Sequence, residues 1–304
     1  MKSNIASVGL IVLTTTLSAA AAPPAAPPAA PPVTGPWSGV DAILGASGRD
    51  LPGGVHRFGW PRRDLAVTVG DVPVAPALAL GSWAGFLATG GEAMAMGDLV
   101  LRESEVAPVL RALQAAGIDV GAIHNHLLAE SPRVVYVHFA AHGDRAALAR
   151  GLRDALGKTA TPLGPASPAA GPGAEGAAAL QRFEQALGRS GSFAGAVLQV
   201  GVPRAEPVVE HGVELPPGMG TATAINAEAA GGGRVAATGD FVLTAGEVNP
   251  VVRELLAHGI EPTALHSHML AESPRLLFLH FWGVGGAEEI GGGLKAALAR
   301  VHTR

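Results

Sequence analysis

The chain contains two tandem copies of one segment, and this duplication limits the folds that it can adopt. Residues 97–139 align without a gap on residues 239–281, at an offset of 142, and about 24 of the 43 positions are identical. Two copies are too few for a solenoid, which needs at least three stacked units. The sequence therefore predicts two pseudo-symmetric domains at residues 37–158 and 179–304, joined by a Pro/Gly/Ala/Thr-rich linker at residues 159–178.

Each copy has the pattern of a mixed domain. Residues 82–87 alternate in a strand-like way. Apolar residues at i, i+3, i+4 and i+7 from Val106 to Leu113 predict a central amphipathic helix. Residues 146–156 and 294–301 favour closing helices. We therefore expect an α+β fold of two tandem pseudo-symmetric domains, each with a small antiparallel sheet, a central helix, a histidine-bearing β-hairpin and a closing helix.

Prolines help to place the start of the central helix. Thr244 and Glu247 have the spacing of a capping box. A start at that box would place Pro250 inside the helix, where proline removes a backbone hydrogen bond. A start near Glu105 and Glu247 instead puts Pro108 and Pro250 in the first turn, where proline is tolerated. We expect the later start.

The most strongly repeated stretch carries three histidines and a glutamate in each copy. If the chain reverses near Ser131, residue 124 lies opposite residue 138, and residues two apart on a strand share a face. Opposed residues have Cβ atoms about 4.5–5.5 Å apart, so their imidazoles can share one ion. The predicted metal ligands are His124, His126 and His138 in the first copy and His266, His268 and His280 in the second.

Imidazole ligands indicate a divalent metal ion, with zinc favoured. A zinc ion with three histidines and an open position lowers the pKa of its bound water to about 7, which would support metal-dependent hydrolysis. Glu130 and Glu272 lie at the expected turns and are candidates for a fourth ligand or for a catalytic general base. The alternative is structural: the histidines cap a polar hairpin face or hydrogen-bond across the interface between the domains.

Other repeated polar residues have two interpretations. Asp98 and Asp240 precede an apolar strand, either as turn residues or as outer partners of the histidines. Arg133 and Arg275 either bind an anionic ligand or stabilise the turn through a salt bridge. Five histidines have no counterpart in the other copy and are expected at the surface: His56, His142, His211, His258 and His302.

Residues 1–22 have the pattern of a signal peptide. Lys2 precedes an apolar run at residues 5–17, and residues 18–22 offer small-residue cleavage sites. The run is shorter than the roughly 20 residues of a membrane span. Residues 23–36 form a Pro/Ala-rich linker. We expect a periplasmic or secreted protein without a stable membrane span after cleavage; a retained N-terminal anchor is the alternative.

Charge and cysteine content exclude several classes of function. The formal net charge of -4 shows no basic excess, which argues against a nucleic-acid partner. The chain has no cysteine, so disulfides, thiolate metal sites, cysteine nucleophiles and lipid attachment through cysteine are excluded. The expected partner is a small molecule or a ligand of the cell envelope, and the sequence does not indicate the oligomeric state.

The repeated motifs resemble the LppY/LpqO family of exported bacterial proteins. Gly-Asp-x-Val-Leu, Glu-Val-x-Pro-Val, His-x-His-x-Leu-Ala-Glu-Ser-Pro-Arg and His-Phe carry the resemblance, which covers nearly all of residues 37–300. It implies export but no activity, because the family is one of unknown function. Its namesakes are lipoproteins, whereas this chain has no cysteine to acylate. A metal-binding exported protein is the leading hypothesis, and a non-enzymatic ligand-binding or structural module is the alternative.

Overall fold

The computed structural model describes Met1, residues 35–164 and residues 169–304. The predicted signal peptide, apart from Met1, and nearly all of the first predicted linker lie outside these residues. From Pro36 to Arg304 the described chain forms one compact unit. None of its helices is both long enough and apolar enough to cross a membrane.

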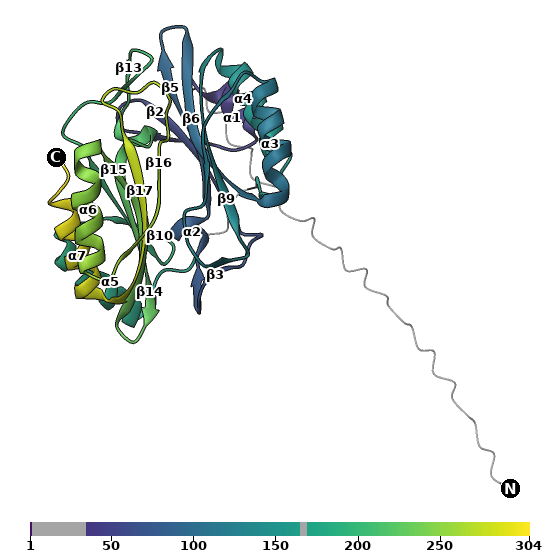
Figure 1. Ribbon diagram of the computed structural model, residues 1–304. Helices are drawn as coiled ribbons and strands as arrows, with labels where there is room; N and C mark the ends of the chain where they lie inside the picture. Colours follow the sequence, from purple (N-terminus) through teal and green to yellow (C-terminus); the bar gives the residue numbers. More distant parts are fainter. Residues whose placement is uncertain (2–34, 165–168) are drawn as a thin grey trace. The chain divides into compact units, whose positions relative to one another are not determined.

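The first repeat is built on a six-stranded antiparallel sheet with helices on its outer face (Figure 1). In spatial order the strands are β1 (Arg49–Leu51), β2 (Val55–Pro61), β5 (Gly81–Thr89), β6 (Glu92–Arg102), β9 (Val134–Gly143) and β7 (Asp119–His124). The covering helices are α1 (Ser38–Leu44), α3 (Glu103–Ala115) and α4 (Arg145–Leu156). Smaller elements are helix α2 (Pro76–Ala79) and a small sheet of β3 (Val67–Val69), β4 (Val72–Val74) and β8 (Glu130–Ser131).

The second repeat has the same sheet order. Its strands are β10 (Ser192–Ala194), β11 (Val197–Pro203), β14 (Ala222–Gly231), β15 (Arg234–Leu243), β17 (Leu277–Gly286) and β16 (Glu261–His266). Its covering helices are α5 (Ala174–Leu187), α6 (Ala245–Ala257) and α7 (Ala287–Leu298). Smaller elements are β12 (Val209–Glu210), β13 (Val213–Glu214) and the 3-10 helix η1 (Pro217–Met219). The α+β expectation is confirmed, although α5 begins inside the segment predicted as a linker.

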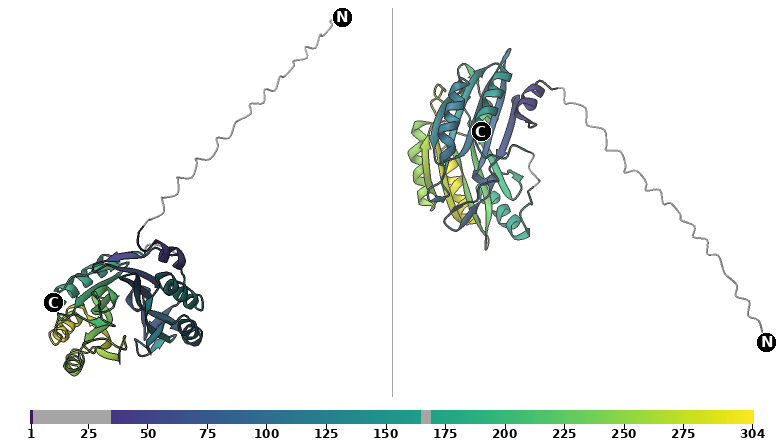
Figure 2. Two further views of the ribbon diagram at one scale, coloured as in Figure 1. Left: turned by 90° about the horizontal axis from the view of Figure 1, so that it is seen from above. Right: turned by 90° about the vertical axis from the view of Figure 1, so that its right-hand side faces the viewer.

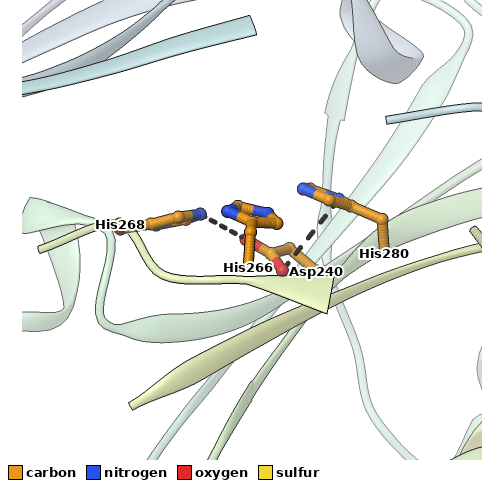
Figure 3. A group of neighbouring side chains, drawn as sticks. All are labelled: Asp240, His266, His268 and His280. Atoms are coloured by element: carbon orange, nitrogen blue, oxygen red, sulfur yellow. Dashed lines mark ion pairs between the residues drawn. The ribbon is translucent and has the colours of Figure 1, made fainter. Parts of the chain in front are cut away.

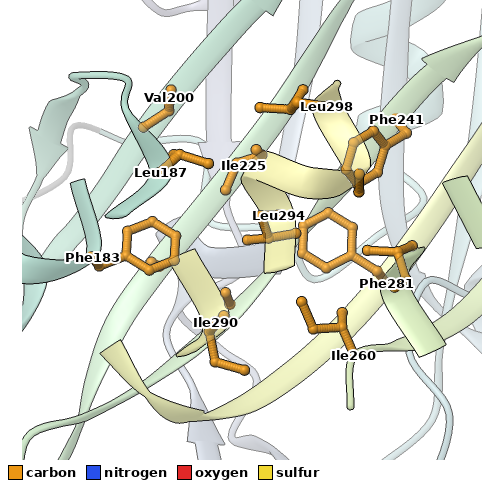
Figure 4. Close-up of a cluster of buried hydrophobic side chains, with 14 of the residues drawn as sticks. Phe183, Leu187, Val200, Ile225, Phe241, Ile260, Phe281, Ile290, Leu294 and Leu298 are labelled. Atoms are coloured by element: carbon orange, nitrogen blue, oxygen red, sulfur yellow. The ribbon is translucent and has the colours of Figure 1, made fainter. Parts of the chain in front are cut away.

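Strand alternation decides which side chains face the helices and which face the other sheet. On β6, Leu99 and Leu101 join the core beneath the helices, whereas Met94, Met96 and Val100 belong to clusters that include the other repeat. Figure 4 shows the helix-covered core of the second repeat, with Phe183, Phe241, Phe281 and Leu294 among its members. Full burial of one such side chain contributes about 1.5–3 kcal/mol.

The inner faces of the two sheets pack against each other, so the order of layers is helices, sheet, sheet, helices (Figure 2). Two apolar clusters hold them together, and both mix the repeats. One contains Tyr136 with Trp282, and the other contains Met96 with Phe278. Tyr136 and Phe278 are equivalent at the offset of 142. Exchange of equivalent residues between two clusters is the arrangement of a pseudo-two-fold axis.

The helix starts differ from the sequence-based expectation. Helices α3 and α6 begin at Glu103 and Ala245, so Glu105 and Glu247 stand in the third helical position. The Glu247 carboxylate accepts a hydrogen bond from Thr244 N at 2.6 Å, as in the capping box. Pro108 and Pro250 therefore lie inside the helices. The expectation was wrong because carboxylate capping outweighs the one backbone bond that each proline removes.

The predicted hairpin also has a different register. His124 lies opposite Tyr136, and Ala122 lies opposite His138, with an irregularity between Val120 and Ala122. A loop at residues 125–133, which includes β8, replaces a tight turn. The predicted pairing of residues 124 and 138 was therefore wrong by two residues. A shift of two keeps every side chain on its original face, so His124 and His138 still share one side of the sheet.

Candidate metal centre

Six histidines and two aspartates meet between the two apolar clusters of the inter-sheet interface. The middle strands supply Asp98 opposite His138 in the first repeat and Asp240 opposite His280 in the second. The edge strands β7 and β16 end at the next pair of histidines, and the loops after them carry the last pair. These edge and loop histidines are His124, His126, His266 and His268.

The imidazoles stack across the two repeats. The ring centroids of His124 and His266 lie 3.5 Å apart. His126 and His280 lie at 3.7 Å, as do His138 and His268. The last two pairs are equivalent at the offset of 142, so the pseudo-two-fold axis passes near the stack of His124 and His266. The histidines were predicted as two separate sites, but the structure brings all six into one cluster.

The second repeat offers the group best suited to hold an ion (Figure 3). One ligand atom from each of its four residues lies within 4.8 Å of the other three, and the residues are Asp240, His266, His268 and His280. His268 Nε2 lies 3.1 Å from Asp240 Oδ2, without the alignment of a hydrogen bond. Figure 3 shows the three imidazoles in a row on one side of the carboxylate.

Three further groups have three members each. Asp98, His126 and His138 form the counterpart in the first repeat. The other two groups combine residues from both repeats: His124, His126 and His280 in one, and His124, His138 and His266 in the other. Because these groups share members, they cannot all be filled at once with complete ligand sets.

Backbone carbonyls orient several of the rings. His280 Nδ1 lies 2.9 Å from Gly239 O, and His266 Nδ1 lies 3.3 Å from Ser267 O. A carbonyl only accepts hydrogen bonds, so each Nδ1 carries the proton and each Nε2 keeps its lone pair. Metal-binding histidines typically donate their second N–H to such a carbonyl or to a carboxylate. His124 is oriented similarly by Asn125 O, but its Nε2 lies 2.9 Å from His138 Nε2.

Burial keeps the imidazoles neutral. It lowers the pKa of His124 and His266 to about 3 and that of His280 to about 4. Burial, with repulsion from Asp240, raises the pKa of Asp98 to about 8. Neutral imidazole is the form that binds metals, whereas a carboxylate must lose its proton to do so. The cluster is therefore ready to accept a cation that displaces protons from carboxylates.

Six buried polar atoms of this cluster have no hydrogen-bond partner in the part of the chain that the structure describes. They are Asp98 Oδ1, Asp240 Oδ1 and the Nε2 atoms of His126, His266, His268 and His280. A buried polar group without a partner costs about 1–3 kcal/mol, so native proteins rarely gather several in one place. Carboxylate oxygens and imidazole nitrogens are together the donor set of a divalent metal ion. The residues fit such an ion.

The two predicted general bases, Glu130 and Glu272, lie outside the cluster of histidines and aspartates. Glu130 Oε1 accepts a hydrogen bond from Val134 N at 3.1 Å, and Glu272 Oε1 accepts one from Leu276 N at 3.0 Å. Both carboxylates thereby close the loop before the following strand, and neither belongs to a group able to hold a metal ion. Burial raises the pKa of Glu130 to about 7. A catalytic role for these glutamates stays a prediction that no contact to the histidines supports.

The two aspartates were only partly recognised from the sequence. The interpretation of Asp98 and Asp240 as turn residues was wrong, since both lie inside long strands. The glycine before each allows close approach of the neighbouring strand: a Cβ at Gly97 would meet Trp83 O at 2.2 Å, and one at Gly239 would meet Ala224 O at 1.9 Å. The occurrence of Gly-Asp in both copies was the sequence signal that could have identified these aspartates as part of the site.

Two secondary expectations are also resolved. Arg275 Nη1 lies 3.1 Å from Glu272 Oε2, which confirms a turn-stabilising salt bridge, whereas Arg133 is exposed. The surface expectation was wrong for His56, which is buried. Its two ring nitrogens contact Asp41 and Asp50 at 2.9 and 2.6 Å, so the polar edges of the buried ring are satisfied.

A cavity of about 480 Å³ borders the cluster. Its lining includes both aspartates and four of the histidines: His126, His138, His268 and His280. Arg57 and Trp83 of the first repeat form another part of the wall. The ligand groups are therefore next to a space of the size that proteins use for small molecules, about 300–1,000 Å³.

Comparison with known proteins places the chain in a family without assigning a function. No curated protein matches it. Two solved structures show distant likeness: a trimeric bacterial microcompartment shell protein, PduB (11% identity, TM-score 0.21, 83% of this chain and 89% of that chain), and EtuB from Clostridium kluyveri (10%, 0.19, 83% and 90%). Scores this low carry no argument. The family described as Domain of Unknown Function (DUF1259) matches residues 38–158 and again residues 181–300, and the chain belongs to this family, with two copies of its domain.

Proposed function

We propose that the protein binds a divalent metal ion, with zinc favoured, between its two repeats. The group of Asp240 and the three second-repeat histidines carries this proposal. It combines three neutral imidazoles with one carboxylate, and the Nε2 atoms of all three rings have no partner among the described residues. Zinc takes histidine nitrogens at about 2.0–2.1 Å and carboxylate oxygens at about 2.0–2.2 Å. Nickel, copper, manganese and iron accept the same ligands.

In this proposal the residues of the first repeat support the metal site of the second repeat and do not hold the ion themselves. The Nε2 atoms of His124 and His138 lie 2.9 Å apart, a distance at which one ring donates a hydrogen bond to the other. This direct contact favours a structural role for these two rings. Asp98, by contrast, lines the cavity and has a pKa raised to about 8 by burial, so it can exchange a proton near neutral pH.

The cavity favours a metal-dependent hydrolase over a sealed structural site. A bound zinc ion would supply an activated water, whose pKa falls to about 7. The chain would contribute the space for a substrate and Asp98, from across the interface, as a carboxyl group that exchanges protons near neutral pH. Glu130 and Glu272, in the loops that follow the edge strands, are not among the described residues that line the cavity.

Export to the periplasm or beyond is part of the same proposal. The signal-like residues 1–22 and the resemblance to the exported LppY/LpqO family support it. Edman sequencing of the protein recovered from culture medium or periplasm should show an N-terminus near residues 18–23. Recovery of the full-length chain only from the cytoplasm would reject export.

Elemental analysis of purified protein tests metal binding. The protein and the His266→Ala/His268→Ala variant are loaded with zinc, dialysed and analysed, together with a His258→Ala/His302→Ala control that changes exposed histidines outside the cluster. We expect the protein and the control to retain zinc and the first variant to lose it. The His124→Ala/His126→Ala variant should lose less. Equal zinc in all four proteins, with circular dichroism showing that each is folded, would reject the proposal.

A further inference from the structure

Arg57 stands in the cavity wall without a carboxylate partner. Its Nη1 donates to Gly218 O at 2.8 Å, and its guanidinium lies 3.8 Å from the centroid of the Trp83 ring. No carboxylate of the described chain lies within ion-pair distance of it. The buried arginines of the two repeats, Arg62 and Arg204, both bind carboxylates. Arg57 has five N–H donors and uses one of them within the described chain, so most of its hydrogen-bonding capacity is free there.

The second repeat has a neutral residue at the position equivalent to Arg57. In the first sheet Trp83 pairs with Asp98 of the next strand, and in the second sheet Ala224 pairs with Asp240. By the same registers, Gln199 takes the place of Arg57. The second sheet forms the same strand order with glutamine and alanine at these positions. Gln199 donates to Ala77 O of the first repeat as Arg57 donates to Gly218 O of the second. A neutral side chain therefore satisfies this contact, and the charge of Arg57 points to a ligand.

The charges around the cavity favour an anion. Asp98 and Asp240 supply two negative charges when ionised, and Arg57 supplies one positive charge. A divalent ion at the proposed metal site would leave one net positive charge around the cavity. Burial lowers the pKa of Arg57 to about 10, so it stays charged at neutral pH. Uncompensated charge in a partly buried site is costly, and an anionic ligand would balance it.

We propose that the cavity binds a small anionic molecule, whose carboxylate or phosphoryl group pairs with Arg57 and whose other end reaches the metal centre. Arginine presents a planar fork that matches both groups with two parallel hydrogen bonds. The Trp83 face holds the plane of the guanidinium by a cation–π contact. The net positive charge and the contact to the metal rest on the proposed function, whereas the free N–H donors of Arg57 do not.

Calorimetric titration with inorganic phosphate and, separately, with acetate tests the proposal. The samples are the zinc-loaded protein, the metal-free protein, Arg57→Gln, which installs the second-repeat residue, and Arg57→Lys. Arg49→Gln is the matched control, since Arg49 is exposed and adds positive charge near Arg57. Loss of a charge-assisted contact should weaken anion binding about tenfold or more in Arg57→Gln. Arg57→Lys should bind with intermediate affinity, and Arg49→Gln should stay within about threefold of the unaltered protein.

The two anions distinguish the chemical source: stronger phosphate binding indicates a phosphoryl ligand, and stronger acetate binding a carboxylate. Zinc content is measured in every sample. Retained zinc with equal anion affinity in the unaltered protein and Arg57→Gln, or with no anion binding at all, would overturn this inference and leave the proposed function standing. Arg57-dependent anion binding in a protein that holds no zinc would support this inference and contradict the proposed function.

Discussion

The two repeats place the same residues on the same strands, yet within the described chain a group of four residues able to hold an ion forms only in the second repeat. In the second repeat His268 Nε2 lies 3.1 Å from Asp240 Oδ2, whereas in the first repeat His126 Nε2 lies 3.7 Å from Asp98 Oδ2. His124 bonds to a histidine of its own repeat, whereas its equivalent keeps a free Nε2 within the described structure. The second repeat thus gathers four residues able to hold an ion, whereas its counterpart in the first repeat gathers three.

The walls of the inter-sheet interface differ as well. A Cβ at Gly121 would lie 2.0 Å from His268 O, so the first repeat makes room for the loop of the second. The equivalent Thr263 instead donates a hydrogen bond to His126 O. The loop that carries His268 is thus held by close packing, and the loop that carries His126 by a hydroxyl. Small differences of this kind can set the ligand distances in each half.

The largest effect of a single substitution is expected where the strands approach most closely. Gly239→Ala should destabilise the protein by more than about 4 kcal/mol, because its Cβ would meet the backbone oxygen of Ala224 at 1.9 Å. Gly201 has no atom within 4 Å of an added Cβ, so Gly201→Ala should stay within about 0.5 kcal/mol. Urea unfolding measures both, and similar midpoints for the two variants would contradict the packing of β14 against β15.

The buried ion pairs should show a smaller difference between the repeats. Arg62 keeps two contacts to Asp64 if Glu105 is removed, whereas Arg204 keeps one contact to Glu206 if Glu247 is removed. Glu247→Ala should therefore cost about 3 kcal/mol, and Glu105→Ala less. Burial would raise the pKa of Glu247, but the hydrogen bonds that it accepts from Arg204, Thr244 and His302 outweigh this and lower the pKa from 4.5 to about 2. The stability that Glu247 contributes is therefore lost as the pH falls from about 4.5 to about 2.

Urea unfolding of both variants at pH 7 and at pH 3 checks this order. Glu105→Gln and Glu247→Gln serve as controls that keep the side-chain volume. A larger loss of stability in Glu105→Ala than in Glu247→Ala would show that the cost does not depend on how many carboxylate contacts each arginine keeps.

Acid should destabilise the metal-free protein through His124 and His266 to a similar extent. His124 and His266 each stay neutral in the folded state down to about pH 3, whereas the unfolded chain binds protons below about 6.5. The unfolded state then binds more protons, so stability falls as the pH falls from about 6.5 to about 3, by up to about 1.4 kcal/mol per pH unit for each histidine.

Unfolding free energies of EDTA-treated protein across this range provide the test. His124→Phe and His266→Phe should each remove one histidine's share of the slope. An unchanged slope in either variant would mean that its ring is not buried in neutral form.

The smallest effect is expected at the hydroxyl between the repeats. Thr263→Ala removes the hydrogen bond to His126 O and should cost about 1 kcal/mol, without loss of zinc from the second repeat. Thr263→Ser keeps the donor and should recover most of the stability. If both variants melt at the same temperature as the unaltered protein, this hydrogen bond does not stabilise the His126 loop, which would then be held by packing alone.

Much of the fold was readable from the sequence because it is encoded locally. Apolar periodicity indicated the central helix, and the period of two placed His124 and His138 on one face even though the register was displaced. Pro250 suggested a later helix start, since no local pattern reveals that Glu247 is anchored by Arg204, 43 residues away. Gly-Asp suggested a turn because glycine marks turns more often than close strand contacts.

The candidate site was only partly predictable. The histidines were recognised by their repetition, but their stacking across the repeats depends on how the two sheets pack. The sequence left Asp240 with two interpretations, a turn residue or an outer partner of the histidines. The pairing of β15 with β17 brings it beside His280. Arg57 and Trp83 carried no repeated signal at all. Their importance emerges from their absence in the second repeat, at positions that the strand registers define.

Diffraction from zinc-soaked crystals at the zinc absorption edge tests the central claim most directly. The account predicts an anomalous peak within about 2.0–2.2 Å of the Asp240 carboxylate and the ring nitrogens of His266, His268 and His280. A folded protein whose anomalous peaks lie only at exposed histidines such as His211, with none inside the cluster, would contradict it.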